Sequence, residues 1–373
     1  MTSFAGDDFC QSRCYLRRGL NMSLDKIECV VIGGGSLALA VTRRLALSGR
    51  EVMLVSRGDR EQDDGGHWVA SGGWPEPIES SILDQPGTLR ASFCAQGAEA
   101  LEVYRGSQDI RFTRTGQLVV ARDAGEMALL RDMAARDPSV RLLSAAEVAQ
   151  HERGLECAGG LIAEDAGVID GDALRLALRI DAETAGAYVT EGCRLVAAYP
   201  MRRGFEIDLG GLPGDLETLR CDLLINAGED VEAVQVASRI DGMRRHLPPE
   251  PLAPGSKRYK LEGTAPFSRL VVPGCRGSKA SALFFSGFQG ESWMDVLASP
   301  EEESDRSSAD RRMADWRIQG QTEHGIVGLV NVFGVDARSE TRASMALAEA
   351  VADTLSGRVA WSAPQPTSRM VLV

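Results

Sequence analysis

The sequence predicts an α/β fold, with a Rossmann-type dinucleotide-binding domain built from discontinuous segments and a second α+β domain on an antiparallel or mixed sheet. Three observations predict it. A strand, glycine turn, helix and strand follow one another between residues 27 and 56. Further apolar strands and helix-like segments alternate as far as residue 355. Four prolines between residues 246 and 254 mark the entry into a separate region.

The first unit begins with a buried strand. Ile27–Ile32 is rich in β-branched residues and runs into glycines, which is typical of a parallel strand covered on both faces. Ser36–Ser48 then has apolar residues at helical spacing, and Gly49 is a natural end for this helix. Glu51–Val55 reads as the next strand. Together these segments predict a βαβ unit.

The turn inside this unit carries the motif Gly33-x-Gly35-x-x-Ala38. Gly33 permits a tight turn, Gly35 lets the backbone approach a pyrophosphate, and the small Ala38 lets the helix pack on the strand. Gly34 and Ser36 lie in the same turn, where the helix N-terminus offers amides to phosphates. We expect all five residues to contact a dinucleotide.

The end of the second strand lacks the Asp or Glu that would bind the adenosine ribose. Ser56 stands there, followed by Arg57. Such a pair suits a 2′-phosphate, so NADP stays open as the dinucleotide; alternatively, Ser56 contacts the ribose weakly. Asn226, Ala227 and Gly228 end a later buried strand, at the sheet edge where cofactors bind.

The remaining elements are predicted more coarsely. Helices are expected at Leu89–Tyr104, Ala124–Asp137, Ala145–His151, Asp172–Gly186 and Glu340–Leu355. Strands are expected at Gly116–Ala121, Tyr188–Val196, Gly204–Leu209, Cys221–Asn226, Leu270–Val272, Leu283–Phe285 and Gly328–Phe333. Residues 58–87 are expected to form an irregular functional loop, and residues 299–315 an exposed charged linker.

Composition narrows the function. The chain has 373 residues and a formal net charge of −12, so its surface repels phosphate backbones and we expect no nucleic-acid partner. It has no run of about 18 apolar residues, so we expect no transmembrane segment. Residues 1–26 are expected to be a disordered extension, with a transit peptide as the alternative, and residues 358–373 a tail. We expect a cytoplasmic protein.

The eight cysteines indicate a reducing compartment. Cys29, Cys193 and Cys221 lie in or beside apolar runs, and we expect them to be small core residues. Cys10 and Cys14 are close together, but their spacing matches neither a redox CxxC nor a zinc pair. We therefore expect no metal.

Several segments resemble the D-amino-acid-oxidase-like FAD oxidoreductases, above all the L-2-hydroxyglutarate dehydrogenase/oxidase group. The order and spacing of these segments carry the resemblance. They are VVIGGG at Val30–Gly35, TGQLVVA at Thr115–Ala121, EDAGVIDGDAL at Glu164–Leu174, APFSRLVVP at Ala265–Pro273, IQGQTEHGIVGLVNVFGVD at Ile318–Asp336 and ASMALAEAVA at Ala343–Ala352.

The resemblance implies an FAD-binding domain over residues 27–110, 145–245 and 316–357, and a substrate domain over residues 111–144 and 246–315. It implies FAD as cofactor, with hydride passing from the α-carbon of a small 2-hydroxy acid to flavin N5. A 2-oxo acid is the product, and oxygen or a quinone accepts the electrons.

The resemblance also implies site residues. His67 is the candidate base, and Arg114 is the candidate cation for a substrate carboxylate. Ser71 and Gly72 in the flavin-proximal element, Leu195 in a later strand and Gly334 after the last strand complete the expected cofactor contacts.

The sequence departs from the family at several of these places. Ala70 stands where the family has a histidine, and Pro254 stands where it commonly has a lysine. Ala337–Thr341 lacks the Pro-Gly pair of the family's terminal loop. A block that the family carries between roughly Asp295 and Ala314 is replaced by a charged loop. We therefore expect a shortened substrate domain.

Three functions follow from these observations. The first is FAD-dependent oxidation of an L-2-hydroxyglutarate-like acid. The second is an impaired homologue that binds a nucleotide or a partner without turnover, as the departures at Ala70, Pro254 and Ser339 suggest. The third is an amino-acid or amine oxidase of the same fold.

Overall fold

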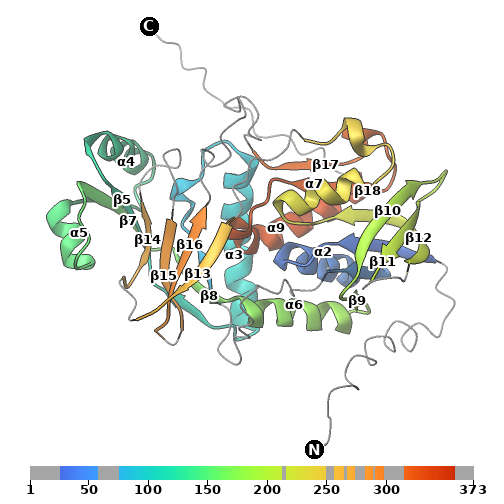
Figure 1. Cartoon of the computed structure of the whole chain (residues 1–373), viewed down its shortest axis with the longest axis horizontal. Coiled ribbons are helices and arrows are strands. Elements are labelled where there is room, and N and C mark those ends of the chain that lie inside the picture. The colour runs from blue at the N-terminus through green and yellow to red at the C-terminus, as the bar shows by residue number, and fades with distance from the viewer. Residues whose placement is uncertain are drawn as a thin grey trace, which may run out of the picture.

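The computed structural model describes residues 26–57, 75–211, 216–248, 256–263, 267–273, 282–288, 290–297 and 315–357. Two bodies lie side by side along the long axis of the molecule, each built on its own sheet (Figure 1). The expected tail, and all but Lys26 of the expected extension, fall outside the described residues.

The first body is built on an eight-stranded sheet with the order β10-β11-β12-β1-β2-β9, in which β18 pairs with β12 and β17 with β18. Its strands are β1 (Lys26–Ile32), β2 (Val52–Val55), β9 (Tyr188–Thr190), β10 (Arg194–Pro200), β11 (Phe205–Gly210), β12 (Leu216–Asn226), β17 (Arg317–Gln319) and β18 (Leu329–Phe333). The run β9-β2-β1-β12-β18 is parallel, and β10, β11 and β17 pair antiparallel with their neighbours. A parallel centre of this kind is the scaffold of dinucleotide-binding folds.

Both faces of this sheet are covered. The face of Cys29 and Val31 shares a core with α2 (Ser36–Leu47), α3 (Leu89–Ser107), α6 (Gly171–Thr184) and α9 (Ala337–Leu355). The opposite face, with Val30 and Ile32, packs with β10, β11 and α7 (Asp230–Ser238). Consecutive residues of β1 from Cys29 onward thus enter different cores, which explains why Cys29–Ile32 is apolar throughout.

The second body is a seven-stranded mixed sheet with the order β13-β16-β15-β14-β5-β7-β6. Its strands are β5 (Gln117–Ala121), β6 (Arg141–Ser144), β7 (Gly159–Ala163), β13 (Ser256–Leu261), β14 (Leu270–Pro273), β15 (Ala282–Ser286) and β16 (Ser292–Leu297). The pair β14–β5 is parallel and the other pairs are antiparallel. Helices α4 (Ala124–Arg136) and α5 (Ala145–His151) lie at its outer end (Figure 1).

One expected domain boundary differs from the sheet boundary. The family resemblance implies that residues 145–245 belong to the FAD-binding domain, but β7 pairs with β5 and β6 in the second sheet, and α5 packs on β7. The chain therefore leaves the second sheet after residue 163, because β7 completes a hydrogen-bonded ladder there.

A three-stranded sheet follows, formed by β3 (Pro75–Ile78), β8 (Gly167–Asp170) and β4 (Phe112–Arg114) in the order β3-β8-β4. It lies against both bodies, since β3 and β8 contact α6, β3 also contacts α9, and Val168 of β8 packs in a core of the second sheet. The remaining short elements are η2 (Ser81–Leu83), η3 (Met243–Arg245) and α8 (Gln321–His324).

The mixed α/β architecture predicted from the sequence is confirmed. Helix α5 has the expected bounds, while α9 begins at Ala337, three residues earlier than expected, and α7 was not expected. Cys29, Cys193 and Cys221 are buried and free, as predicted. Burial raises the pKa of the Cys29 thiol to about 12, so this residue stays an uncharged part of the core.

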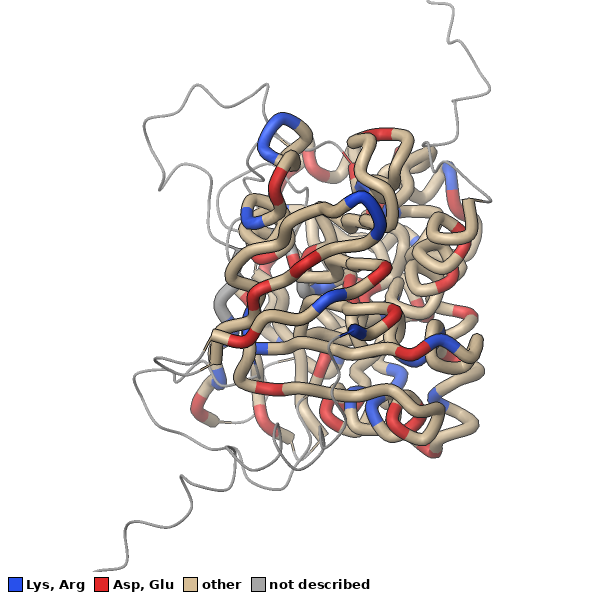
Figure 2. The backbone as a smooth tube through the Cα atoms, turned by 90° about the vertical axis from the view of Figure 1, so that its right-hand side faces the viewer, with Lys and Arg blue, Asp and Glu red and all other residues tan. Residues whose placement is uncertain are grey.

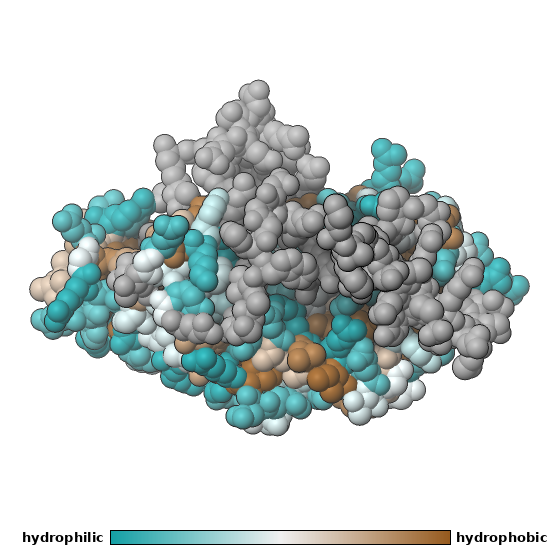
Figure 3. Space-filling view, turned by 60° about the horizontal axis from the view of Figure 1, so that its bottom comes forward, coloured by the Kyte–Doolittle hydropathy of each residue, from teal (hydrophilic) through white to brown (hydrophobic). Residues whose placement is uncertain are grey.

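The surface of the described residues carries charges of both signs. Acidic and basic positions are interspersed on the side that Figure 2 shows. One exposed pair joins β12 and β11, where Arg220 Nη2 lies 3.1 Å from Glu206 Oε2. Where Figure 3 shows described residues, a few hydrophobic side chains lie among hydrophilic ones. On α6, the exposed hydrophobic residues are Leu176 and Ile180, each about half exposed. Among the described helices, none is long and apolar enough to cross a membrane.

Candidate functional site

The glycine turn lies between β1 and α2, held from both sides by neighbouring strands. The Gly33 amide donates to the Val55 carbonyl at 3.1 Å, and the Ala227 amide donates to the Ile32 carbonyl at 2.9 Å. Gly33 has φ +150°, and a Cβ atom there would lie 2.5 Å from the Ala227 carbonyl oxygen. Only glycine fits this position without a shift of the backbone.

The helix that follows the turn has no cap of its own. Gly35 is the N-cap residue of α2, no side chain caps the helix locally, and its first turn holds no acidic residue. The first amides of a helix lack partners within the helix and carry the positive end of its dipole. The end of α2 therefore has the features of an anion-binding position, and the predicted contacts of the motif with a dinucleotide stay a prediction. Ser36 and Ala38 of the motif are buried at this end.

The carboxyl end of β12 lies beside this turn, as expected. Asn226 Nδ2 donates to the Ala233 carbonyl at 2.7 Å and to Asn331 Oδ1 at 3.0 Å. Its Oδ1 accepts from the Gly228 amide at 3.4 Å. These bonds join β12, β18 and α7, so the Asn226 side chain fixes the strand ends around the turn.

Ser56 and Arg57 end β2 next to the same turn. A Cβ atom on Gly34 would lie 2.9 Å from Ser56 Oγ, which places this hydroxyl against the turn. Arg57 Nε lies 3.8 Å from Glu232 Oε1 on α7. The Arg57 guanidinium, which could favour a 2′-phosphate, is thus close to the carboxylate of Glu232.

Helix α9 brings an unexpected group of polar side chains to this place. Its first turns contain buried residues that a surface helix would expose, namely Arg338, Ser339, Glu340, Thr341, Arg342 and Ser344. Asp336 caps the helix, accepting from the Arg338 amide at 3.2 Å and from Ser339 Oγ at 2.7 Å. The start of α9 therefore points its polar side chains into the interior, against α2 and β3.

Glu340 reaches across to α2. Its Oε1 accepts a hydrogen bond from the Leu37 amide, the second residue of α2, at 2.6 Å. Carboxyl oxygens of Glu340 and Glu229 lie so close to Gly35 that a Cβ atom on this residue would clash with them. The exposed end of the glycine turn is thus covered by two carboxyl groups.

Further polar contacts join this pair to the sheet β3-β8-β4. Ser36 Oγ and Thr341 Oγ1 lie 3.3 Å apart, and Thr341 Oγ1 donates to Glu76 Oε2 on β3 at 2.5 Å. Glu76 also forms an ion pair with Arg175 of α6. The described contacts give this group three carboxyl groups, those of Glu76, Glu229 and Glu340, and one guanidinium.

Both carboxyl groups beside Gly35 have shifted pKa values. Burial raises the pKa of Glu340 well above its ordinary value, and the neighbouring Glu229 raises it further. Burial also raises the pKa of Glu229, which shares a hydrogen bond with Glu340. Two carboxyl groups can share such a bond only when one carries a proton. The pair therefore holds a proton that exposed glutamates would have lost.

Two arginines of α9 are engaged by the chain itself. Arg338 Nη2 lies 2.6 Å from Glu79 Oε1, and both side chains are buried. Arg342 donates to the carbonyls of Cys94 and Glu79, and its Nη2 lies 3.7 Å from Asp165 Oδ2. Arg338 Nε is buried and has no hydrogen-bond partner among the described residues, so it could donate to a bound anion.

The other predicted site residues lie apart from this group or outside the described chain. Leu195 is a core residue of β10, packed with the face of Ile32. Arg114 is exposed at the end of β4, and Gly334 follows β18 with φ +83°. His67, Ser71 and Gly72 lie outside the described residues, as do Ala70 and Pro254.

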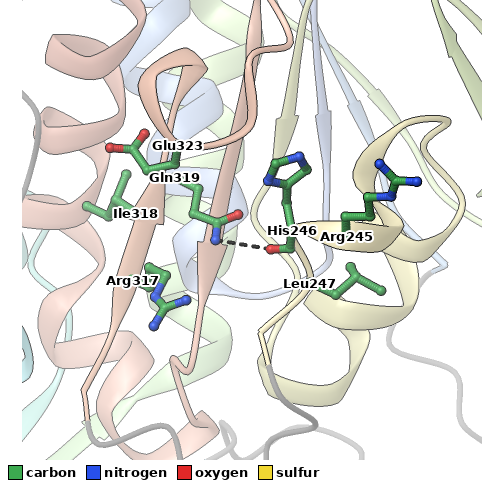
Figure 4. A pocket seen from close by; sticks show the side chains of 7 residues that line it. All are labelled: Arg245, His246, Leu247, Arg317, Ile318, Gln319 and Glu323. Atoms are coloured by element: carbon green, nitrogen blue, oxygen red, sulfur yellow. Dashed lines mark hydrogen bonds between the residues drawn. The ribbon is translucent and has the colours of Figure 1, made fainter.

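A separate open cavity of about 490 Å³ lies at the edge strand β17. It is lined by Arg245, His246, Leu247, Arg317, Ile318, Gln319 and Glu323. Gln319 Nε2 donates to the His246 carbonyl at 3.2 Å across it (Figure 4). It contains none of the predicted site residues, so we do not assign the cofactor to it.

Sequence reasoning missed Glu76, Glu229, Glu340, Arg338 and Arg342. An acidic residue in the first turn of a helix is an ordinary N-terminal signal and predicts a solvent-facing side chain. The available signal was the number of charged residues at the very start of α9, where the family's terminal loop departs from its pattern.

Comparison with known proteins identifies the family. A model described as FAD dependent oxidoreductase matches residues 28–242, more than half of the chain. The chain belongs to the FAD dependent oxidoreductase family. The matched stretch includes the glycine turn, the end of β12 and α7, so the family's sequence pattern covers the first half of the site.

The curated relatives of this family member include L-2-hydroxyglutarate dehydrogenases. The mitochondrial enzyme of Arabidopsis thaliana is 24% identical over 410 residues, covering 88% of this chain and 83% of that one. The human mitochondrial enzyme is 27% identical over 175 residues, covering 45% of this chain and 36% of that one. The first alignment is longer than the 373 residues of this chain, so the plant enzyme carries insertions relative to it.

Solved structures share the fold. Glycine oxidase from Geobacillus kaustophilus has a TM-score of 0.64 at 16% identity, covering 90% of this chain and 96% of that one. The dithionite-reduced L-α-glycerophosphate oxidase from Mycoplasma pneumoniae, with FAD bound, has a TM-score of 0.67 at 13% identity, covering 92% and 97%. At such identities the likeness is one of fold.

FAD is the cofactor that the family assigns to the chain, and the turn fits it. Gly33 and Gly35 have no side chain that would keep a pyrophosphate from the backbone, and no local side chain caps α2. A pyrophosphate requires both features. The Leu37 amide, however, is already bonded to Glu340. The residues at hand therefore fit FAD on the condition that this carboxyl group moves.

Proposed function

We propose that the chain catalyses the FAD-dependent oxidation of a small 2-hydroxy acid of the L-2-hydroxyglutarate type to the 2-oxo acid. The observation that carries this proposal is the match to the plant L-2-hydroxyglutarate dehydrogenase, which extends over 88% of the chain. It is supported by the presence of both bodies, the dinucleotide-binding sheet and a second mixed sheet.

When bound, FAD supplies the acceptor for the hydride that leaves the substrate α-carbon. The glycine turn and the first amides of α2 would hold its phosphates, and the ends of β1, β2 and β12 would line its path. The chain must also supply cations for the two carboxylates and a base for the hydroxyl.

Arg338 is the cation that the geometry favours. It is buried at the start of α9, and its Nε has no hydrogen-bond partner in the described chain. Its ion pair with Glu79 fixes the guanidinium but leaves this donor available. Arg114 is the second candidate, and His67 remains the candidate base.

The test is the visible absorption spectrum of the purified protein, followed by anaerobic addition of L-2-hydroxyglutarate. The proposal expects a flavin spectrum that bleaches, with little change on addition of the D-enantiomer. Bleaching by glycine or sarcosine alone would instead select an amino-acid or amine oxidase. Flavin that no acid reduces would contradict the proposed activity while leaving the family assignment intact.

A second candidate function is a homologue that binds FAD or a partner without turnover. The observation that favours it is that acidic residues of the chain itself already neutralise both arginines of the site. Glu79 pairs with Arg338, and Asp165 lies near Arg342. Stable flavin with no reduction in the experiment above would support this function.

A further inference from the structure

We propose that the Glu340 carboxyl group is an internal hydrogen-bond acceptor that occupies the pyrophosphate position of the cofactor-free chain, so that its displacement determines the affinity for FAD. The inference concerns cofactor binding only. It stands whichever substrate the protein oxidises, and its test does not use turnover.

The position of the carboxyl group is the first argument. The turn motif places a dinucleotide pyrophosphate over Gly35 and on the first amides of α2. In this structure Glu340 Oε1 accepts a hydrogen bond from the Leu37 amide at 2.6 Å, and carboxyl oxygens of Glu340 and Glu229 lie over Gly35. The space and the hydrogen-bond donor that a phosphate needs are used by the same side chain.

The way in which Glu340 is held is the second argument. Its neighbour Thr341 bonds Glu76 and lies 3.3 Å from Ser36 Oγ, while Asp336 caps the helix on which both residues lie. Helix α9 itself packs along α2. The carboxyl group is thus held at the end of α2 because the helix that carries it packs along α2.

The charges around Glu340 are the third argument. The groups that face it are Glu229 before α7, Glu76 on β3 and the Leu37 amide on α2, and Arg175 of α6 pairs with Glu76. On its own helix, Arg338 and Arg342 are directed to Glu79, Cys94 and Asp165.

A pyrophosphate cannot be added to this arrangement without loss. It would bring negative charge beside the buried Glu340 and the half-buried Glu229, with one guanidinium among the described contacts, and it would compete for the same amide. Binding must therefore exchange the Glu340 carboxyl group for a phosphate at this amide. The carboxyl group leaves the Leu37 amide, and the phosphate takes it.

The experiment measures cofactor affinity in flavin-free protein. FAD is titrated by its fluorescence into the wild type, Glu340→Gln and Glu340→Ala, and ADP is titrated by calorimetry as a probe that carries the pyrophosphate without the flavin. Glu340→Gln keeps the shape and an oxygen acceptor but cannot ionise, whereas Glu340→Ala removes the acceptor and leaves its space empty. Glu349→Gln is the matched control, because it removes an exposed charge from the same helix, paired with Arg44.

We expect Glu340→Ala to bind FAD and ADP at least about tenfold more tightly than the wild type, because it frees the Leu37 amide and the space over Gly35 for a phosphate. Glu340→Gln keeps an acceptor at this amide and should bind less tightly than Glu340→Ala. Glu349→Gln should bind as the wild type does. Equal affinity in the wild type and both Glu340 variants would overturn the proposal. So would failure of FAD and ADP to bind any variant that retains the wild-type circular dichroism spectrum.

Discussion

The N-termini of α2 and α9 lie side by side and are completed in opposite ways. Helix α9 is capped by its own Asp336, which precedes it in the chain. Helix α2 has a glycine at this position and takes its cap from Glu340, 303 residues away. A helix that caps itself needs no other group, whereas one that begins with glycine leaves its amides for a partner. The comparison supports the proposal that the first amides of α2 receive a phosphate and that Glu340 accepts from one of them in the cofactor-free chain.

The largest expected effect comes from closing the turn before α2. Gly33→Ala should lower the free energy of unfolding by roughly 3 kcal/mol or more, because its Cβ would meet the Ala227 carbonyl in a strained backbone. Urea denaturation followed by circular dichroism measures this change. Gly49→Ala is the control, since Gly49 also has positive φ (+83°) but open space around it. A loss equal to that of the control, about 1 kcal/mol, would mean that the neighbouring strand can move aside.

A smaller effect is expected at α9. Asp336→Ala removes the cap and the ion pair with Arg90, and should lower the free energy of unfolding by about 1–2 kcal/mol. Asp336→Asn keeps a capping oxygen and should recover a large part of this loss. Thermal unfolding of the flavin-free variants distinguishes the two contributions. Equal stability of the wild type and Asp336→Ala would show that α9 depends on packing alone.

The smallest expected effect is a pH dependence of the stability, caused by Glu340, which caps α2. The folded-state pKa of Glu340 lies above its unfolded value, so its contribution to stability is full below the unfolded value and is lost as pH rises through the folded value. Glu340→Gln cannot ionise and should escape this loss. The melting temperature of the variant should therefore rise relative to the wild type as pH increases from 5 to 8. A difference that does not change with pH would contradict the buried, protonated pair.

Much of the fold could be predicted from the sequence because its pattern is local. Cys29–Ile32 alternates between two cores and is apolar throughout, and Gly33 and Gly35 mark the turn that follows. The placement of β7 could not be predicted in this way. A short apolar strand such as Gly159–Ala163 fits either sheet, and only the ladder to β5 and β6 decides between them.

The site was predictable on one side only. The spacing of the turn glycines predicts a dinucleotide-binding turn, whereas Glu340 and Glu229 resemble ordinary acidic residues at the start of a helix. Their burial depends on how α9 packs along α2 and on where α7 begins, which are tertiary facts. The same reason explains why Arg338 was missed, since its partner Glu79 lies 259 positions earlier in the chain.

The parallel pair β14–β5 has a consequence for the order in which the chain can fold. It joins Leu270 to Gln117, and the pair β12–β18 joins Leu224 to Leu329, so both sheets contain strands from distant parts of the chain. A chain emerging from the ribosome carries β5 long before its partner β14 exists, and α2 long before α9 can cover it. Neither sheet is complete until strands from distant parts of the chain are present, and α9 completes the core around α2. Folding of this protein therefore depends on many contacts between distant segments, and it should be sensitive to the loss of α9.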